Sequence, residues 1–156
     1  DNFPEAAIRE LGYHVVYSGQ KKYNGVAIIS RFPIDDVQTD IEGFPDMQRR
    51  ILAVTIKDLR IVNLYVPNGS EVGSDKYQYK LEWLAKVTAF IKEQLTEYPK
   101  LAVVGDFNIA PEDNDVHDPQ EWLGSVMLSD AERSAYTTIT DLGLTDVFRY
   151  KHPKLV

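Results

Sequence analysis

A strand that ends in polar residues is predicted by the stretch Leu101-Ala102-Val103-Val104-Gly105-Asp106-Phe107-Asn108-Ile109-Ala110-Pro111. Its four apolar residues, bounded by polar ones, are typical of a buried strand. Gly105 permits a tight backbone path directly after them. Because side chains two residues apart point to the same side of an extended chain, we expect Asp106 and Asn108 to leave the strand together. A plain strand-to-loop turn, in which Asp and Asn are common, would explain the same pattern.

A second strand that ends in polar residues is predicted by Val62-Asn63-Leu64-Tyr65-Val66-Pro67-Asn68-Gly69. A tyrosine at a strand end can donate a hydrogen bond to an anionic oxygen, although for Tyr65 taken alone we favour a half-buried aromatic residue that only ends the strand. Taken together, the two stretches suit a Mg²⁺-assisted attack on a phosphodiester. Asp106 would orient the attacking water or donate to the leaving group, while Asn108 and Tyr65 would neutralise charge on the phosphoryl oxygens.

The composition excludes several classes of protein. With 156 residues, 44% of them hydrophobic, the chain suits one domain with a real core and not a disordered segment. No apolar run approaches the roughly 20 residues of a membrane span. The absence of cysteine excludes disulfides and Cys-based zinc sites and fits a reducing compartment. The net charge of −7 argues against a non-specific nucleic-acid binder, but not against an enzyme with a local basic groove.

The hydrophobic pattern predicts an α/β fold with strand pairs and packed helices. Strands are expected over residues 13–17, 25–30, 49–57, 60–65 and 101–104, with a short edge strand within 35–46. Helices are expected over residues 4–11, 75–98 and 129–142. The long helix would be capped by Ser74 or Asp75, and the later one by a capping box of Ser129 and Glu132. The acidic segment 112–126 is expected to be functional or to contain short helical turns.

Several charged residues can be interpreted either as ligand contacts or as solvated surface. In Gln48-Arg49-Arg50, a guanidinium can meet phosphate, although for Arg49 we favour a solvated charge pair. The loop Lys21-Lys22-Tyr23-Asn24 can lie along a nucleic-acid backbone or be plain solvated surface, and the same holds for Lys76 and Lys80. His117 lies between acidic residues, but it has no partner at metal-ligand spacing, so a metal site there is not favoured.

Both polar strand ends resemble the exonuclease III family of abasic-site endonucleases, within the endonuclease/exonuclease/phosphatase superfamily. The Gly-Asp-x-Asn motif at residues 105–108 is typical of the superfamily, and Tyr-x-Pro-Asn-Gly at 65–69 of its bacterial DNA-repair branch. The likeness extends in order to Leu11-Gly12-Tyr13, Tyr23-Asn24-Gly25-Val26-Ala27-Ile28, Gln48-Arg49-Arg50-Ile51, Asp115-Val116-His117-Asp118-Pro119 and Gly143-Leu144-Thr145-Asp146-Val147-Phe148-Arg149.

This resemblance implies part of a deoxyribonuclease-like, four-layered α/β sandwich, with two mostly antiparallel sheets flanked by helices. It implies Mg²⁺- or Mn²⁺-dependent cleavage of double-stranded DNA 5′ to abasic sites, with 3′–5′ exonuclease, 3′-phosphatase and RNase H activity, in the bacterial cytoplasm. By motif position, Asp106 would be the catalytic aspartate, Asn108 the transition-state stabiliser and metal neighbour, and Tyr65 the phosphate-binding tyrosine. DNA contacts are expected from Tyr23, Asn24, Gly25, Arg50, Asn68 and Lys76.

The resemblance also implies missing parts. Family members begin with strands that end in an Asn and in a metal-binding Glu, upstream of position 1, and finish with a Ser-Asp-His motif beyond position 156. We therefore expect residues 1–156 to be a single domain that forms the central portion of the enzyme, with little nuclease activity alone. Exposed sheet edges in such a piece predict self-association.

Two alternatives remain open at the level of sequence. One is another phosphodiesterase of the same superfamily, acting on phosphoinositides or sphingolipids; the Pro-Asn-Gly after Tyr65 and the lack of an apolar membrane-facing loop weigh against it. The other is a non-catalytic DNA-binding or scaffold module, against which the net charge of −7 argues.

Overall fold

The computed structural model describes residues 3–44 and 48–155. The chain divides into two compact units, each built from two segments. The first unit is Asp1–Tyr65 with Glu93–Phe107, and the second is Val66–Lys92 with Asn108–Val156. The chain therefore passes between units inside both polar strand-end stretches, once after Tyr65 and once after Phe107.

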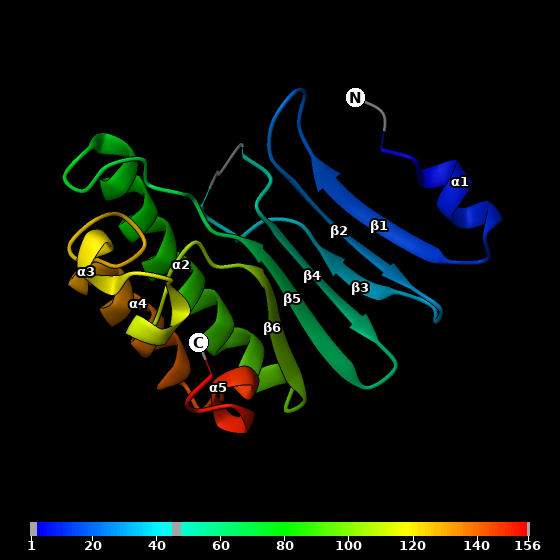
Figure 1. The fold of residues 1–156 in the computed structure, drawn as a ribbon. Helices are drawn as coiled ribbons and strands as arrows, with labels where there is room; N and C mark the ends of the chain where they lie inside the picture. Colours follow the sequence, from blue (N-terminus) through cyan, green and yellow to red (C-terminus); the bar gives the residue numbers. More distant parts are fainter. Residues whose placement is uncertain (1–2, 45–47, 156) are drawn as a thin grey trace. The chain divides into compact units, whose positions relative to one another are not determined.

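The described part of the first unit holds two sheets (Figure 1). In the smaller one, β1 (His14–Gly19) and β2 (Gly25–Ser30) form an antiparallel hairpin, and the short helix α1 (Glu5–Glu10) contacts β1. The larger sheet has the order β3-β4-β5-β6. Its strands are β3 (Asp35–Gln38), β4 (Ile51–Ile56), β5 (Leu59–Tyr65) and β6 (Leu101–Asp106). Among the described strands only β5 and β6 pair in parallel, so the predicted α/β class with mostly antiparallel sheets is confirmed.

The core of the first unit forms where the hairpin packs on the larger sheet. Val26 and Ile28 of β2 meet Leu52 and Val54 of β4, and all four are buried. Alternating residues of β2 face this core, as the period of a strand requires. The first four residues of β4 are all buried, so both faces of this strand are covered there.

The second unit is helical in its described residues. Its elements are α2 (Asp75–Glu97, whose last turn from Glu93 belongs to the first unit), a 3₁₀ turn η1 (Asp113–Asp115), α3 (Pro119–Trp122), α4 (Asp130–Thr140) and α5 (Val147–Lys151). The predicted caps are confirmed. The Ser74 hydroxyl accepts from the Tyr77 N–H at 3.2 Å, and Ser129 with Glu132 forms a capping box at the start of α4. The acidic segment contains short helical turns, as predicted.

The helix α1 contains no buried residue, and Leu11, directly after it, is 76% exposed. One prediction of burial is wrong. The strand β6 is only half-buried, with Val104 43% exposed, because among the described strands it is the last of its sheet and has a neighbour on one side. No helix in the described part of the chain combines the length and apolar character that crossing a membrane needs.

Candidate functional site

Tyr65 and Asp106 end two neighbouring parallel strands in the first unit. The register of β5 and β6 pairs them as the last residues of the ladder. The two strands approach closely because residue 105 is glycine: a Cβ atom there would lie 2.0 Å from the Leu64 carbonyl oxygen and 2.8 Å from Asn63 Oδ1. The predicted tight path at Gly105 is thus confirmed. The Asp106 side chain is exposed at this end of the sheet.

Arg50 holds the backbone and the ring of Tyr65. Its guanidinium lies 4.5 Å from the centre of the Tyr65 ring, and its Nη1 donates to the Tyr65 carbonyl oxygen at 3.0 Å. The Tyr65 N–H donates to the Arg50 carbonyl at 2.8 Å. The remaining nitrogens of the guanidinium donate to Gln48 Oε1 at 3.0 Å and to Asn24 Oδ1 at 3.3 Å. Arg50 is only 9% exposed, so its guanidinium is committed mainly to neighbours inside the unit.

Asn68 and Asn108 meet in the second unit. Asn108 Nδ2 donates to the Val66 carbonyl at 2.9 Å, and its Oδ1 accepts from Asn68 Nδ2 at 3.4 Å. The expectation of extended backbone through this stretch is wrong. The strand ends at Asp106, and Asn108 has a φ of 47°, in the left-handed region that Asn tolerates better than most residues. The alternation rule therefore does not set the direction of the Asn108 side chain.

A buried ion pair of Lys80 and Glu132 supports the two Asn loops. Lys80 Nζ contacts the Glu132 carboxylate and donates to the main-chain carbonyls of Asn108 at 2.6 Å and Asn68 at 3.1 Å. Both side chains are fully buried. The reading of Lys80 as surface or as a phosphate contact is wrong. A signal for this was its position four residues before Leu84, on the apolar stripe of the helix.

Glu132 is satisfied by backbone and side-chain donors as well. It accepts from the Met127 N–H at 3.0 Å and from the Ser129 hydroxyl at 2.5 Å, and the Tyr77 hydroxyl bonds that same hydroxyl at 2.6 Å. A buried ion pair is stable only when further hydrogen bonds compensate both charges. The capping box at the start of α4 is thus joined to α2, and through Lys80 to the Asn108 loop.

The residues expected to contact DNA lie in several environments. Tyr23 is 75% exposed, and Lys76 and Asn68 are also exposed. Gly25 closes the β1–β2 hairpin, where a Cβ atom would lie 3.3 Å from Gly19 Cα. Arg49, beside Arg50, forms an ion pair of 2.6 Å with Asp40 in which both side chains are about 40% exposed, as the solvated reading predicts.

The acidic loop residues serve local structure. Asp115 pairs with Arg149, and Asp118 accepts from the N–H groups of Gln120 and Glu121 at the start of α3. His117 is exposed. Among the residues that the structure describes, no three His, Asp or Glu side chains are grouped to hold a metal ion. Asp106 and Asn108 carry oxygen donors of the type that suits Mg²⁺ or Mn²⁺, but two such donors do not complete a ligand set.

A tyrosine and a carboxylate form a coupled pair beside the acidic loop. The Tyr136 hydroxyl donates to Asp146 Oδ2 at 2.8 Å. Burial, with the hydrogen bond to Asp146, raises the pKa of Tyr136 above its usual range. Burial alone would raise the pKa of Asp146, but hydrogen bonds from the Arg149 N–H, the Tyr136 hydroxyl and the Phe148 N–H outweigh it and hold that pKa below its usual value.

The chain is similar to known proteins over nearly its whole length. Residues 1–152 match the endonuclease/exonuclease/phosphatase family. Exodeoxyribonuclease III of Haemophilus influenzae is 30% identical over 166 residues, which cover 97% of this chain and 61% of the relative. The 3′ phosphatase NExo from Neisseria, solved with product DNA hairpin, superposes with a TM-score of 0.97 at 44% identity, covering 99% of this chain and 61% of that one. An AP endonuclease from Archaeoglobus fulgidus superposes with a TM-score of 0.91 at 38% identity, covering 97% of this chain and 59% of that one. The chain thus spans about three fifths of these relatives' length.

Proposed function

Because the chain belongs to the endonuclease/exonuclease/phosphatase family, we propose that it hydrolyses phosphodiester bonds in DNA as part of DNA repair. The proposed reaction is cleavage 5′ to abasic sites, together with 3′–5′ exonuclease action. The names of the similar proteins, an exodeoxyribonuclease III, a 3′ phosphatase and an AP endonuclease, support this choice. The observation that carries it is the register of β5 and β6, which pairs Tyr65 with Asp106 at the carboxyl ends of two parallel strands.

Three side chains take proposed roles in the reaction. The exposed carboxylate of Asp106 orients the attacking water and receives its proton, or passes a proton to the leaving oxygen. The hydroxyl of Tyr65 donates a hydrogen bond to a phosphoryl oxygen, where negative charge builds in the transition state. The amide of Asn108 stabilises the same charge. Its hydrogen bond to the Val66 carbonyl and its left-handed backbone fix this side chain before substrate arrives.

A divalent cation, Mg²⁺ or Mn²⁺, is the proposed cofactor. When bound, such a cation acts as a Lewis acid that stabilises the leaving oxygen. This chain would contribute the carboxylate of Asp106 and the amide oxygen of Asn108 as donors. Since the described residues hold no cluster of three acidic or His side chains, we also propose that this 156-residue polypeptide alone turns over slowly.

Double-stranded DNA with abasic sites or 3′ ends is the proposed substrate, and the bacterial cytoplasm the proposed location. The exposed Tyr23, Asn68 and Lys76, with Asn24 and Gly25 of the hairpin, are the proposed DNA contacts. Arg50 acts on this surface mainly by holding Tyr65 and Asn24. In the described part of the first unit, β6 is the last strand of its sheet, and strands in that position tend to pair with a further chain, so we further propose self-association of this chain. A clean monomer in light scattering contradicts that last point.

Single-turnover incision at protein excess tests the proposed function, because it detects slow chemistry. The substrate is an end-labelled duplex with one abasic site, in Mg²⁺ or Mn²⁺, compared with the intact duplex. Cleavage 5′ to the abasic site that is lost in Asp106→Asn supports the proposal. Hydrolysis of a phosphoinositide or sphingomyelin instead would support a lipid phosphodiesterase. Salt-dependent DNA binding without any cleavage would support a non-catalytic module. Rapid multiple turnover contradicts the proposed low activity of this polypeptide.

A further inference from the structure

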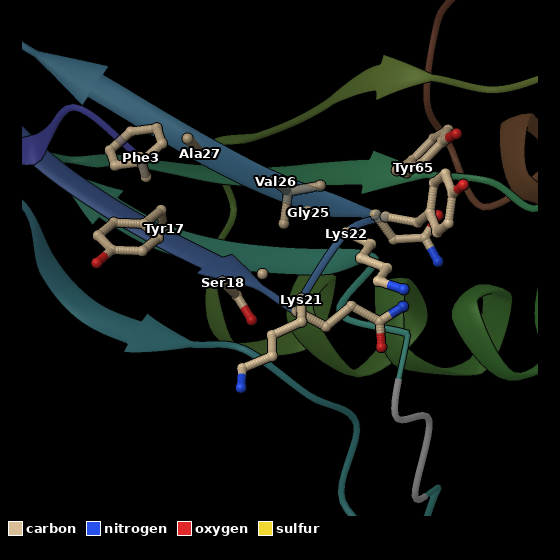
Figure 2. Close-up of a pocket in the computed structure, with 13 residues that line it drawn as sticks. Phe3, Tyr17, Ser18, Lys21, Lys22, Gly25, Val26, Ala27 and Tyr65 are labelled. Atoms are coloured by element: carbon tan, nitrogen blue, oxygen red, sulfur yellow. The ribbon is translucent and has the colours of Figure 1, made fainter. Parts of the chain in front are cut away.

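A pocket of about 720 Å³ opens along the β1–β2 hairpin of the first unit. It is lined by residues 17–27, by Phe3 and by Tyr65. Its volume falls within the roughly 300–1,000 Å³ that is usual for small-ligand sites. In the view of Figure 2, Phe3 and Tyr17 lie at one end of the pocket and Tyr65 at the other, with Lys21 and Lys22 between them.

One end of the pocket is an aromatic platform. The rings of Phe3 and Tyr17 stack with centroids 4.3 Å apart and planes 25° from parallel. Tyr17 is nevertheless 45% exposed, because the hairpin buries its opposite face, with Val26 and Ile28, in the core. Opposite Tyr17 in the ladder is Ala27, so no large side chain of β2 covers the ring from the paired position. Exposed aromatic faces of this kind are typical of binding surfaces.

The middle of the pocket is cationic. Its lining contains Lys21 and Lys22 and no acidic residue, on a chain whose net charge is −7. Within the described part of the chain, neither lysine forms an ion pair. The pocket therefore combines two lysine ammonium groups in its middle with flat aromatic faces at its ends.

We propose that this pocket binds an unpaired nucleotide of a DNA strand, with its base on the Phe3–Tyr17 pair and its phosphates near Lys21 and Lys22. Aromatic side chains stack on any base, while lysines follow the phosphate backbone. A paired base in a duplex keeps its faces stacked on its neighbours, so the ligand must be single-stranded or frayed. The proposal rests on the proposed function only in the choice of DNA as the ligand. Because Tyr65 forms the other end of the pocket, the bound nucleotide would lie beside the phosphate that this tyrosine contacts.

Two oligonucleotides of equal length separate base stacking from charge. One is a fluorescent oligothymidylate, and the other is a strand of the same length with tetrahydrofuran at every sugar, which keeps the phosphates and lacks the bases. Affinities are measured by fluorescence anisotropy in EDTA at low salt, using the full chain. We expect the wild-type protein to bind the oligothymidylate roughly ten-fold more tightly than the baseless strand.

Variants assign this preference to the pocket. Tyr17→Ala is expected to bind both strands equally, Tyr17→Phe to keep the preference, and Tyr150→Ala, which removes an exposed tyrosine outside the pocket, to behave as wild type. Lys21→Gln should weaken the binding of both strands and lower the magnitude of the slope of log affinity against log salt concentration by about 0.7. Circular dichroism checks that each variant is folded.

Equal affinity of the wild type for the two strands, or an unchanged preference in folded Tyr17→Ala, overturns the proposal. The binding assay contains no metal and involves no cleavage, so its outcome is independent of the incision assay with Asp106→Asn. Base-dependent binding without incision retains the pocket and rejects the nuclease, and the opposite result rejects the pocket alone.

Discussion

The buried ammonium of Lys80 donates a 2.6 Å hydrogen bond to the main-chain carbonyl of Asn108. The same ammonium contacts Glu132 and the carbonyl of Asn68, so one cation fixes both Asn loops of the second unit and the start of α4. Its effect on the proposed reaction is indirect, because it holds the backbone of a proposed catalytic residue. Lys80 is therefore a positioning residue.

Lys80→Met should destabilise the protein by about 3–5 kcal/mol, because it leaves the Glu132 carboxylate buried without its cation. The measurement is urea unfolding followed by circular dichroism. Lys86→Met, on an exposed position of the same helix, is the matched control and should change stability by less than about 0.5 kcal/mol. The double variant Lys80→Met/Glu132→Leu should recover part of the loss. A loss of less than about 1 kcal/mol in the single variant would show that the pair is not the anchor we describe.

Gly105→Ala should be costly for a different reason. A methyl group at this position would meet the Leu64 carbonyl oxygen at 2.0 Å, and the φ of 122° disfavours any L side chain. We expect a loss of about 2 kcal/mol or more and separation of β5 from β6, on whose register the Tyr65–Asp106 pair depends. Gly43→Ala has a similarly positive φ with open space around it and should cost only about 1 kcal/mol. Equal losses in the two variants would exclude the steric explanation.

Strand ends could be predicted from sequence, whereas burial and pairing across the chain could not. Period-two and period-3.6 patterns depend on local geometry, and they located β2, the β4–β5 hairpin, α2 and the capping box of α4 closely. The apolar run of β6 predicts a strand equally well at the centre or at the edge of a sheet, so its exposure was missed. The same patterns treat lysine as surface, and only the distant Glu132 explains why Lys80 is buried.

For the candidate site, too, the sequence indicates the residues at the strand ends but not the contacts between residues that are distant in the chain. The residues Tyr65, Asp106 and Asn108 stood out because each follows an apolar strand. The turn at Asn108 was missed, since its left-handed backbone is stabilised by the Val66 carbonyl and by Lys80, which are distant in sequence. The Phe3–Tyr17 stack was missed for the same reason: the two rings come from separate elements, and neither has a motif.

Arg50→Lys distinguishes a positioning role from direct contact with DNA. Lysine cannot reproduce the planar fork that bonds Gln48, the Tyr65 carbonyl and Asn24, nor the stacking of the guanidinium on the Tyr65 ring. We expect a loss of stability of about 1–2 kcal/mol, together with a changed chemical shift of the Tyr65 ring.

The neighbouring Arg49→Lys is the control for Arg50→Lys, because Arg49 makes a single exposed ion pair with Asp40. It should change stability by less than about 1 kcal/mol. Weaker DNA binding by Arg50→Lys with unchanged stability and an unchanged Tyr65 signal would instead assign Arg50 to the DNA surface.

Tyr136→Phe should lower stability at neutral pH and weaken the part of its pH dependence that comes from Asp146. The pKa of Asp146 is held below its ordinary value of 3.8, so the stability that its carboxylate adds is complete above that value and is lost as the pH falls through the lowered one. Removal of the Tyr136 hydroxyl deletes one of the hydrogen bonds that favour the ionised form, so the Asp146 pKa should rise towards 3.8 and stability at neutral pH should fall by about 1 kcal/mol. Carboxyl chemical shifts report the pKa, and urea unfolding reports the stability. The control is Tyr150→Phe, which changes an exposed ring and should alter neither the Asp146 pKa nor the stability. If the Asp146 pKa stays constant in Tyr136→Phe, its lowering comes from the backbone N–H groups of Arg149 and Phe148 alone.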